Sequence, residues 1–273
     1  MAFDLDDIHQ HIRKLRKHLK RWPKHATPKQ VHSLRTTARR FETAMQALAL
    51  DSNKNERRLL RKMAQLRSRA GKVRDLDVLT GFVAALKMGA EEEECRVQLL
   101  EHLGAEHADR NERLHSFAVR HRKSLRRRLK RTATHLQTWS LDGITGPTAP
   151  GYTMLSELRW QQDLTRPLRL TRKNLHPYRL RVKKLRDMLQ MEKDPTDREF
   201  IETLGRVKDA IGEWHDWQQL LKIASENLHH ATKCQFISEF QKITQQKFKH
   251  ATAIANAGRN QIQSSLSEPA TTT

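Results

Sequence analysis

Apolar residues recur every three or four positions through most of this chain, which is the spacing of one face of an α-helix. The clearest run follows a capping signal, because Thr27 suits the N-cap, Pro28 the first helical position and Gln30 a capping box. The apolar positions that follow are Val31, Leu34, Ala38, Phe41, Met45 and Leu48. We therefore predict a helix over about residues 28–50 with one buried face.

The same spacing predicts five helical segments on each side of residues 138–153, the longest stretch rich in glycine and proline. Before this linker they cover about 5–21, 28–50, 54–70, 73–88 and 90–136. After it they cover about 153–170, 174–191, 196–211, 213–230 and 232–263. Short loops between helices are typical of antiparallel bundles. We predict an all-α fold, one domain over 1–273, with helical halves at 5–137 and 154–263 and a disordered tail at 264–273.

A second, cationic stripe lies one position round from the apolar face of the helix at 28–50. Its members are His32, Arg35 and Arg39, with Arg40 beside them. After the linker, Leu175, Tyr178, Val182, Leu185 and Leu189 form an apolar stripe, and the cations beside it are His176, Arg179, Lys183, Lys184 and Arg186. Positions 32, 35 and 39 lie 144 residues before positions 176, 179 and 183. The layout therefore occurs twice.

A second pair of blocks occurs in the same order. Gly71, Asp75 and Leu79 lie 141 residues before Gly212, Asp216 and Leu220. Two repeated blocks predict an internal duplication with pseudo-twofold architecture. Each Asp follows a basic residue, Arg74 or His215, and we expect it to cap a helix or to orient a neighbouring cation. We expect the two glycines to mark helix ends or close packing.

The first predicted helix carries an equivalent pair of stripes. Its apolar positions are Ile8, Ile12, Leu15 and Leu19, and its basic positions are His9, Arg13, Arg16 and Lys20. The counterpart after the linker is weaker, since Glu157 and Trp160 fall opposite Arg13 and Arg16. There the cations Arg159, Arg166 and Arg169 follow a different register. The two halves are therefore related without being interchangeable.

The overall charge points to an acidic partner. Lys and Arg number 52 against 31 Asp and Glu, a formal net charge of +21, and such a chain repels itself unless a polyanion neutralises it. Cys95 and Cys234 have no CxxC or Cys/His neighbourhood, so neither a disulfide framework nor a metal site is predicted. No stretch approaches the roughly 18 apolar residues of a membrane span. We therefore predict a soluble, cytoplasmic protein with no membrane partner.

The two motifs VHSLRTTARRF (31–41) and LHPYRLRVKKLRDML (175–189), each followed by a Gly…Asp…Leu block, resemble the CHAD family of conserved-histidine α-helical domains over about residues 5–263. The resemblance implies a central basic cavity that binds inorganic polyphosphate without turnover and without a cofactor, and it suggests association with polyphosphate granules. The positions that match the family motif are His32, Arg35, Arg39, Arg40, His176, Arg179, Lys183 and Lys184. The stripes add Arg186, Arg13, Arg16 and Lys20 to this predicted site, with Asp75, Asp216, Arg74 and His215 in support.

This sequence departs from the family pattern at Pro177, which directly follows the second motif histidine. Proline is tolerated in the first helical turn but costs about 3 kcal/mol deeper in a helix. We therefore predict that His176 lies in the first turn, with Asn174 as the N-cap. Many family members also carry a triphosphate-processing domain, which is absent from this sequence.

A nucleic-acid-binding helical protein is the first alternative, because charge alone does not separate polyphosphate from non-specific DNA or RNA binding. Single-strand binders stack bases on exposed aromatic rings, whereas Phe41 and Tyr178 fall on the apolar stripes. The basic run at 122–131 is typical of the exposed face of a long helix. We expect it to serve as an auxiliary landing patch at most.

A metal phosphohydrolase of the HD type is the second alternative, because His215 and Asp216 form an HD pair. The equivalent pair in the first half is Arg74 and Asp75. Arginine does not ligate metals, so the repeat favours a structural or anion-orienting role for both pairs. The predicted protein is therefore a binding protein and not an enzyme.

Overall fold

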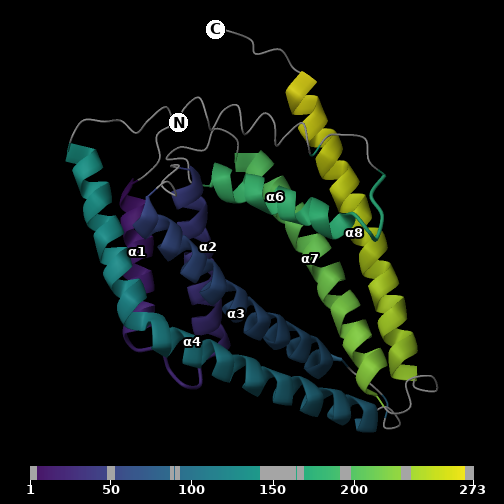
Figure 1. Ribbon diagram of the computed structural model, residues 1–273. Helices are drawn as coiled ribbons and strands as arrows, with labels where there is room; N and C mark the ends of the chain where they lie inside the picture. The colour runs from purple at the N-terminus through teal and green to yellow at the C-terminus, as the bar shows by residue number, and fades with distance from the viewer. Residues whose placement is uncertain are drawn as a thin grey trace. The chain divides into compact units, whose positions relative to one another are not determined.

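The computed structural model describes residues 5–47, 53–86, 89, 93–141, 164, 169–190, 198–228 and 235–267. Figure 1 shows helices joined by loops, and the described residues contain no strand. The helices are α1 (Leu5–Lys20), α2 (Pro28–Ala47), α3 (Lys54–Ala85), α4 (Glu93–Leu141), α6 (Leu175–Leu189), α7 (Arg198–Asn227) and α8 (Gln235–Ser267). The predicted all-α fold is confirmed. Most of the helix predicted at 153–170 lies outside the described residues, as does Cys234, and α8 continues into the predicted tail.

Helix α2 begins as its sequence predicts. The Gln30 amide donates to Thr27 Oγ1 over 3.3 Å, and the Thr27 amide donates to Gln30 Oε1 over 2.9 Å, so the capping box is formed. The predicted apolar faces of α1, α2 and α6 are buried at every described position. At the start of α6, Asn174 occupies the residue before the helix, but its side chain accepts from the Thr171 amide over 2.7 Å.

The prediction of separate helices on either side of Gly71 and Gly212 is wrong. Helix α3 runs unbroken through Gly71, and α7 runs unbroken through Gly212. A glycine inside a helix costs about 1 kcal/mol relative to alanine, and tertiary packing overrides that preference. Asp75 and Asp216 consequently lie in helix interiors, so neither acts as a helix cap.

The chain divides into two compact units, of which the first comprises residues 1–86 and 100–150. In this unit α1 packs on α2, and α2 packs on α3 (Figure 1). Its fully buried side chains include Ile12, Leu15, Leu19, Leu34, Phe41, Met45, Leu59, Met63 and Leu66. Each such side chain contributes roughly 1.5–3 kcal/mol through burial. The apolar stripes predicted from spacing therefore form this core.

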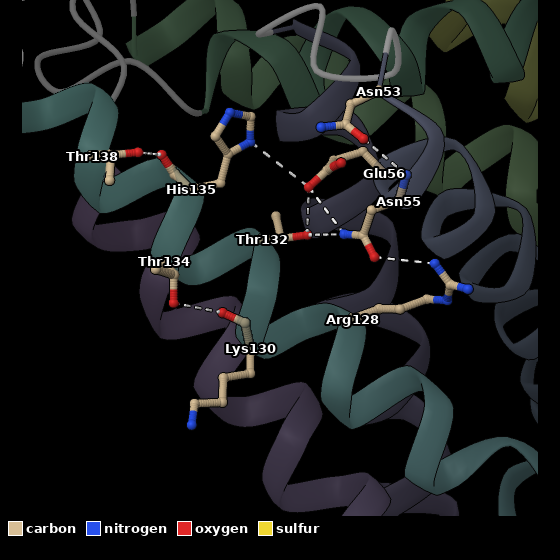
Figure 2. A network of polar contacts seen from close by, with 9 residues as sticks. All are labelled: Asn53, Asn55, Glu56, Arg128, Lys130, Thr132, Thr134, His135 and Thr138. Carbon is tan, nitrogen blue, oxygen red and sulfur yellow. Dashed lines mark hydrogen bonds and ion pairs between the residues drawn. The ribbon is translucent and has the colours of Figure 1, made fainter.

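A buried carboxylate joins the start of α3 to α4 (Figure 2). Glu56 is 2% exposed, and its Oε1 accepts from Thr132 Oγ1 over 3.0 Å and from Asn55 Nδ2 over 3.1 Å. Asn55 in turn accepts from Arg128 Nη1 over 3.1 Å. His135 Nδ1 lies 3.8 Å from the same Glu56 oxygen. Because a buried carboxylate needs donors, this network ties two segments far apart in sequence.

Replacing Thr132 by valine is expected to lower the free energy of unfolding by about 1.5 kcal/mol, because a buried carboxylate loses one of its donors. Urea denaturation of the purified variant measures the change. The matched control is Thr134→Val in the same helix, whose hydroxyl donates to the carbonyl of Lys130 and is exposed. An equal loss in both variants would show that valine in α4, and not the network, is responsible.

The second unit comprises residues 87–99 and 151–273. Helix α7 packs against both α6 and α8. The core includes Leu175, Val182, Leu185, Leu204, Ile211, Trp214, Ala251 and Ala255. Helices α7 and α8 approach closely at Gly258, where an added Cβ would lie 2.6 Å from Val207 Cγ2. The apolar face of α6 therefore packs in the core of this unit. The adjacent basic face of α6 does not belong to that core.

Candidate anion-binding site

The basic stripe of α2 lies beside cations from α3. His32 and Arg40 are exposed, whereas Arg35 and Arg39 are half-buried. Partial burial lowers the pKa of His32, and the positive charges of Arg74, Arg35 and Arg39 lower it further, in that order. His32 is therefore surrounded by positive charge from two helices, as expected of a site built for an anion.

A cavity of about 720 Å³ opens beside His32. Its other polar lining residues include Arg74, Asp77 and His107. His107 Nε2 lies 3.1 Å from Asp77 Oδ1. Burial raises the pKa of Asp77, although His107 and Arg74 oppose that shift. The structure therefore places one carboxylate and several cationic groups around the same cavity.

The sequence prediction missed Asp77 and His107. It selected Asp75, which is exposed on α3, because Asp75 aligns with Asp216 across the repeat. Asp77 and Asp75 lie on nearly opposite sides of α3, because two residues turn a helix by roughly 200°. His107 lies 30 residues away on α4, and no local spacing signals that contact. The orienting role of Asp75 and of the half-buried Asp216 stays a prediction.

The basic stripe of α6 is held by α7. His176, Arg179, Lys183 and Arg186 are half-buried, and Lys184 is exposed. Arg179 Nε donates to the carbonyl of Lys208 over 3.1 Å, and Arg186 Nε donates to the carbonyl of Ile201 over 3.3 Å. The predicted cations of the second half therefore lie along one helix, with two of them anchored to the neighbouring backbone.

Both anchored arginines of α6 cross a buried glycine of α7. A Cβ added at Gly212 would lie 2.8 Å from Arg179 Nη2, and one at Gly205 would lie 3.2 Å from Arg186 Nε. Each accepting carbonyl belongs to the residue four positions before the glycine, the position to which the glycine amide bonds within an α-helix. The missing side chain thus gives the guanidinium access to a helix carbonyl.

A related contact occurs in the first unit, where Arg35 lies over Gly71 with its Nε 3.4 Å from an added Cβ. The close-packing interpretation is therefore confirmed at Gly212, whereas the contact at Gly71 has an ordinary van der Waals distance. Gly205 was not selected from sequence because it has no counterpart in the repeated block.

His176 and His215 stack on one another. Their ring centroids lie 4.0 Å apart with an interplanar angle of 36°. Burial, His176 and Arg179 lower the pKa of His215 to about 4, and burial, Arg179 and Lys183 lower the pKa of His176. The Nδ1 atoms of both rings are buried without a hydrogen-bond partner among the described residues. Both shifts therefore favour the neutral form of the rings.

The contacts of His215 bear on the His215-Asp216 pair. His215 contacts His176 and places its Nε2 2.9 Å from Gln219 Nε2. Within the part of the chain that the structure describes, no group of three or more His, Cys, Asp or Glu side chains is arranged to hold a metal ion. Among the described residues, His215 thus contacts the side chains of His176 and Gln219.

The lowered pKa of His215 predicts acid sensitivity. An unfolded histidine titrates near its ordinary pKa of about 6.5, so the unfolded state binds the proton first. The contribution of neutral His215 to folding stability is therefore complete above the unfolded-state pKa and is lost as the pH falls toward 4. We expect the urea midpoint to fall less between pH 7.5 and pH 5 in His215→Gln than in the unsubstituted protein. If the urea midpoints of the two proteins changed equally with pH, His215 would not be the source of the acid sensitivity.

The remaining predicted cations lie elsewhere. On α1, Arg13 and Lys20 are exposed and Arg16 is half-buried, and Lys20 lines a separate cavity with residues of α1 and α2. Arg169 is exposed, and Arg159 and Arg166 lie outside the described residues. The basic run of α4 is mostly exposed as predicted, but Arg126 and Arg128 are half-buried, and Arg128 donates to Asn55.

Comparison with known proteins identifies one family. The CHAD domain family model matches residues 6–225. No match is found among curated proteins. Among solved structures, a crystal structure of the CHAD domain from the plant Ricinus communis aligns with a TM-score of 0.65 and 17% sequence identity, over 93% of this chain and 88% of that chain. At this identity the likeness concerns the fold. Among the described helices, none is long and apolar enough to cross a membrane.

Proposed function

The chain belongs to the CHAD domain family, and from that premise we propose that it binds inorganic polyphosphate without turnover, through the cationic stripes of α2 and α6. The observation that carries this proposal is the charge around the two stripe histidines. Burial lowers the pKa of His32 and of His176, and neighbouring arginine or lysine side chains lower it further. Such mutual repulsion is relieved when a polyanion binds.

The ligand chemistry suits these side chains. Polyphosphate is a flexible string of anionic tetrahedra without bases, so its receptor needs many cationic donors along a path. Arginine offers a planar fork to two oxygens, and lysine offers a mobile point charge. A histidine beside the chain becomes a stronger donor because the anion favours its protonated form. The mixture along α2 and α6 therefore fits a ligand with no fixed register.

Single-strand nucleic-acid binding has less support. Phe41 is fully buried and Tyr178 is 6% exposed, both within the cores. These rings are therefore not available to stack bases, which is the usual source of base contact energy in single-strand binders. The exposed basic face of α4 favours duplex binding as the second candidate, since backbone contacts alone suffice for non-specific affinity.

The deciding experiment is a competition titration of labelled polyphosphate against duplex DNA, RNA and ATP at one fixed salt concentration. We expect unlabelled polyphosphate to compete at least tenfold better per phosphate than any nucleic acid, and affinity to fall steeply with added salt. The same samples, assayed for phosphate, should show no release. Equal competition by duplex DNA would overturn the proposal, and phosphate release abolished by His215→Ala would overturn the absence of turnover.

A further inference from the structure

A second basic cavity lies at the end of α1, the loop that follows it and the start of α2. Its volume is about 690 Å³, within the roughly 300–1,000 Å³ of small-molecule sites. Lys14, Lys17, Lys20 and Arg21 all line it, and no Asp or Glu side chain of the described chain does so. The cavity therefore gathers four positive charges on a short stretch of chain.

This cavity is distinct from the stripe of α2. Ser33, which lines it, lies 3.1 Å from His18 Nε2 of α1. Arg35 lies over Gly71 of α3 instead, and His32 lines the cavity that Arg74 and His107 share. Thus the side of α2 that faces α1 carries this cavity, and the side that faces α3 carries the proposed polyphosphate stripe.

A buried donor provides an independent indication of a ligand. Trp22 lines the cavity and is 8% exposed. Its indole Nε1 is buried and has no hydrogen-bond partner among the described residues. A buried N–H without a partner has lost its hydrogen bonds to water, and native proteins leave few such groups. The Trp22 side chain therefore combines contact with the cavity and an unpaired donor.

We propose that this cavity is an anion site for a compact run of two to four phosphoryl groups. Three ammonium groups and one guanidinium around one cavity match several negative charges held close together. Such a ligand is either a free oligophosphate or one segment of a longer polymer. The site does not depend on the function proposed for α2 and α6.

The test uses tripolyphosphate and the full chain. We expect Trp22→Phe to remove most of the change in tryptophan fluorescence that tripolyphosphate causes. We expect Lys14, Lys17 and Arg21, replaced together by alanine, to weaken tripolyphosphate binding at least tenfold by calorimetry. Lys20 stays unchanged because it also belongs to the predicted polyphosphate set. Circular dichroism verifies the fold, which should survive because the three side chains are exposed.

The matched control replaces the exposed α4 residues Arg122, Lys123 and Arg127 by alanine, with the same change in charge. An equal loss in both variants, or no loss in the α1 variant, overturns the site. If long-chain polyphosphate binding also weakens tenfold in the α1 variant, the occupant is a polymer segment; if it is unchanged, the occupant is a free oligophosphate. Failure of polyphosphate to outcompete DNA affects only the proposal for α2 and α6.

Discussion

Alanine at the four central cations of the two stripes is expected to abolish tight polyphosphate binding while leaving the protein folded; these cations are Arg35, Arg39, Arg179 and Lys183. Each charge-assisted contact contributes about 1.5–3 kcal/mol, so several lost contacts weaken affinity by orders of magnitude. The fold should persist because the apolar faces of α2 and α6 remain in their cores. Calorimetric titration and circular dichroism measure the two effects.

The control for this variant removes four exposed charges from α4, namely Arg122, Lys123, Arg127 and Lys130. Arg126 and Arg128 are avoided because the first is half-buried and the second bonds to Asn55. We expect the control to lose much less affinity than the stripe variant. If both lose affinity equally, binding is diffuse surface attraction and the assignment to α2 and α6 is wrong.

Two double variants separate the contributions of the halves. One carries Arg35→Ala with Arg39→Ala, and the other carries Arg179→Ala with Lys183→Ala. If one polyphosphate chain contacts both stripes, as the resemblance implies, each double variant lowers the affinity of the same sites without changing their number. Loss of half the binding stoichiometry in each variant would show independent sites and contradict a shared channel.

Gly212→Ala is expected to weaken polyphosphate binding roughly 10- to 100-fold, equivalent to the loss of one charge-assisted contact. The new methyl group would lie 2.8 Å from Arg179 Nη2 and 3.0 Å from its Nε, so the guanidinium must shift from its position above the Lys208 carbonyl. The free energy of unfolding should change little, because alanine favours the helix by up to about 1 kcal/mol and offsets the lost bond. Calorimetry and urea denaturation measure both quantities.

The matched control is Gly71→Ala, the same substitution at the repeat position of α3. Its methyl group would meet Arg35 Nε at 3.4 Å, an ordinary contact distance. We expect affinity for polyphosphate to stay within about twofold, a free-energy change of roughly 0.4 kcal/mol. Equal losses at both glycines, or none at Gly212, would show that the position of Arg179 does not govern binding.

Periodicity predicted much of this structure because burial follows helical spacing. Val31, Leu34 and Phe41 are all fully buried, and the cations one position round are less so. The α6 stripe has the same spacing of apolar and cationic residues as the α2 stripe, so the sequence pattern predicted its buried face as well. Local patterns are sufficient where one face of one helix meets one core.

Contacts between helices could not be predicted in this way. Gly71 and Gly212 are helix breakers by local preference, yet each lies inside a helix, with an arginine of the neighbouring helix against it. The pairing of Asp77 with His107 and of Glu56 with Thr132 joins residues 30 and 76 positions apart. Such pairs depend on packing geometry, which residue spacing does not encode.

The stacked imidazoles have a consequence for acid–base balance. Rings 4.0 Å apart repel each other when both are charged, so His176 and His215 titrate as one unit that accepts its first proton far more readily than its second. A polyanion beside them favours that first proton, which must come from the solvent. Ligand binding near neutral pH would then be accompanied by proton uptake, and its calorimetric heat would vary with the ionisation enthalpy of the buffer.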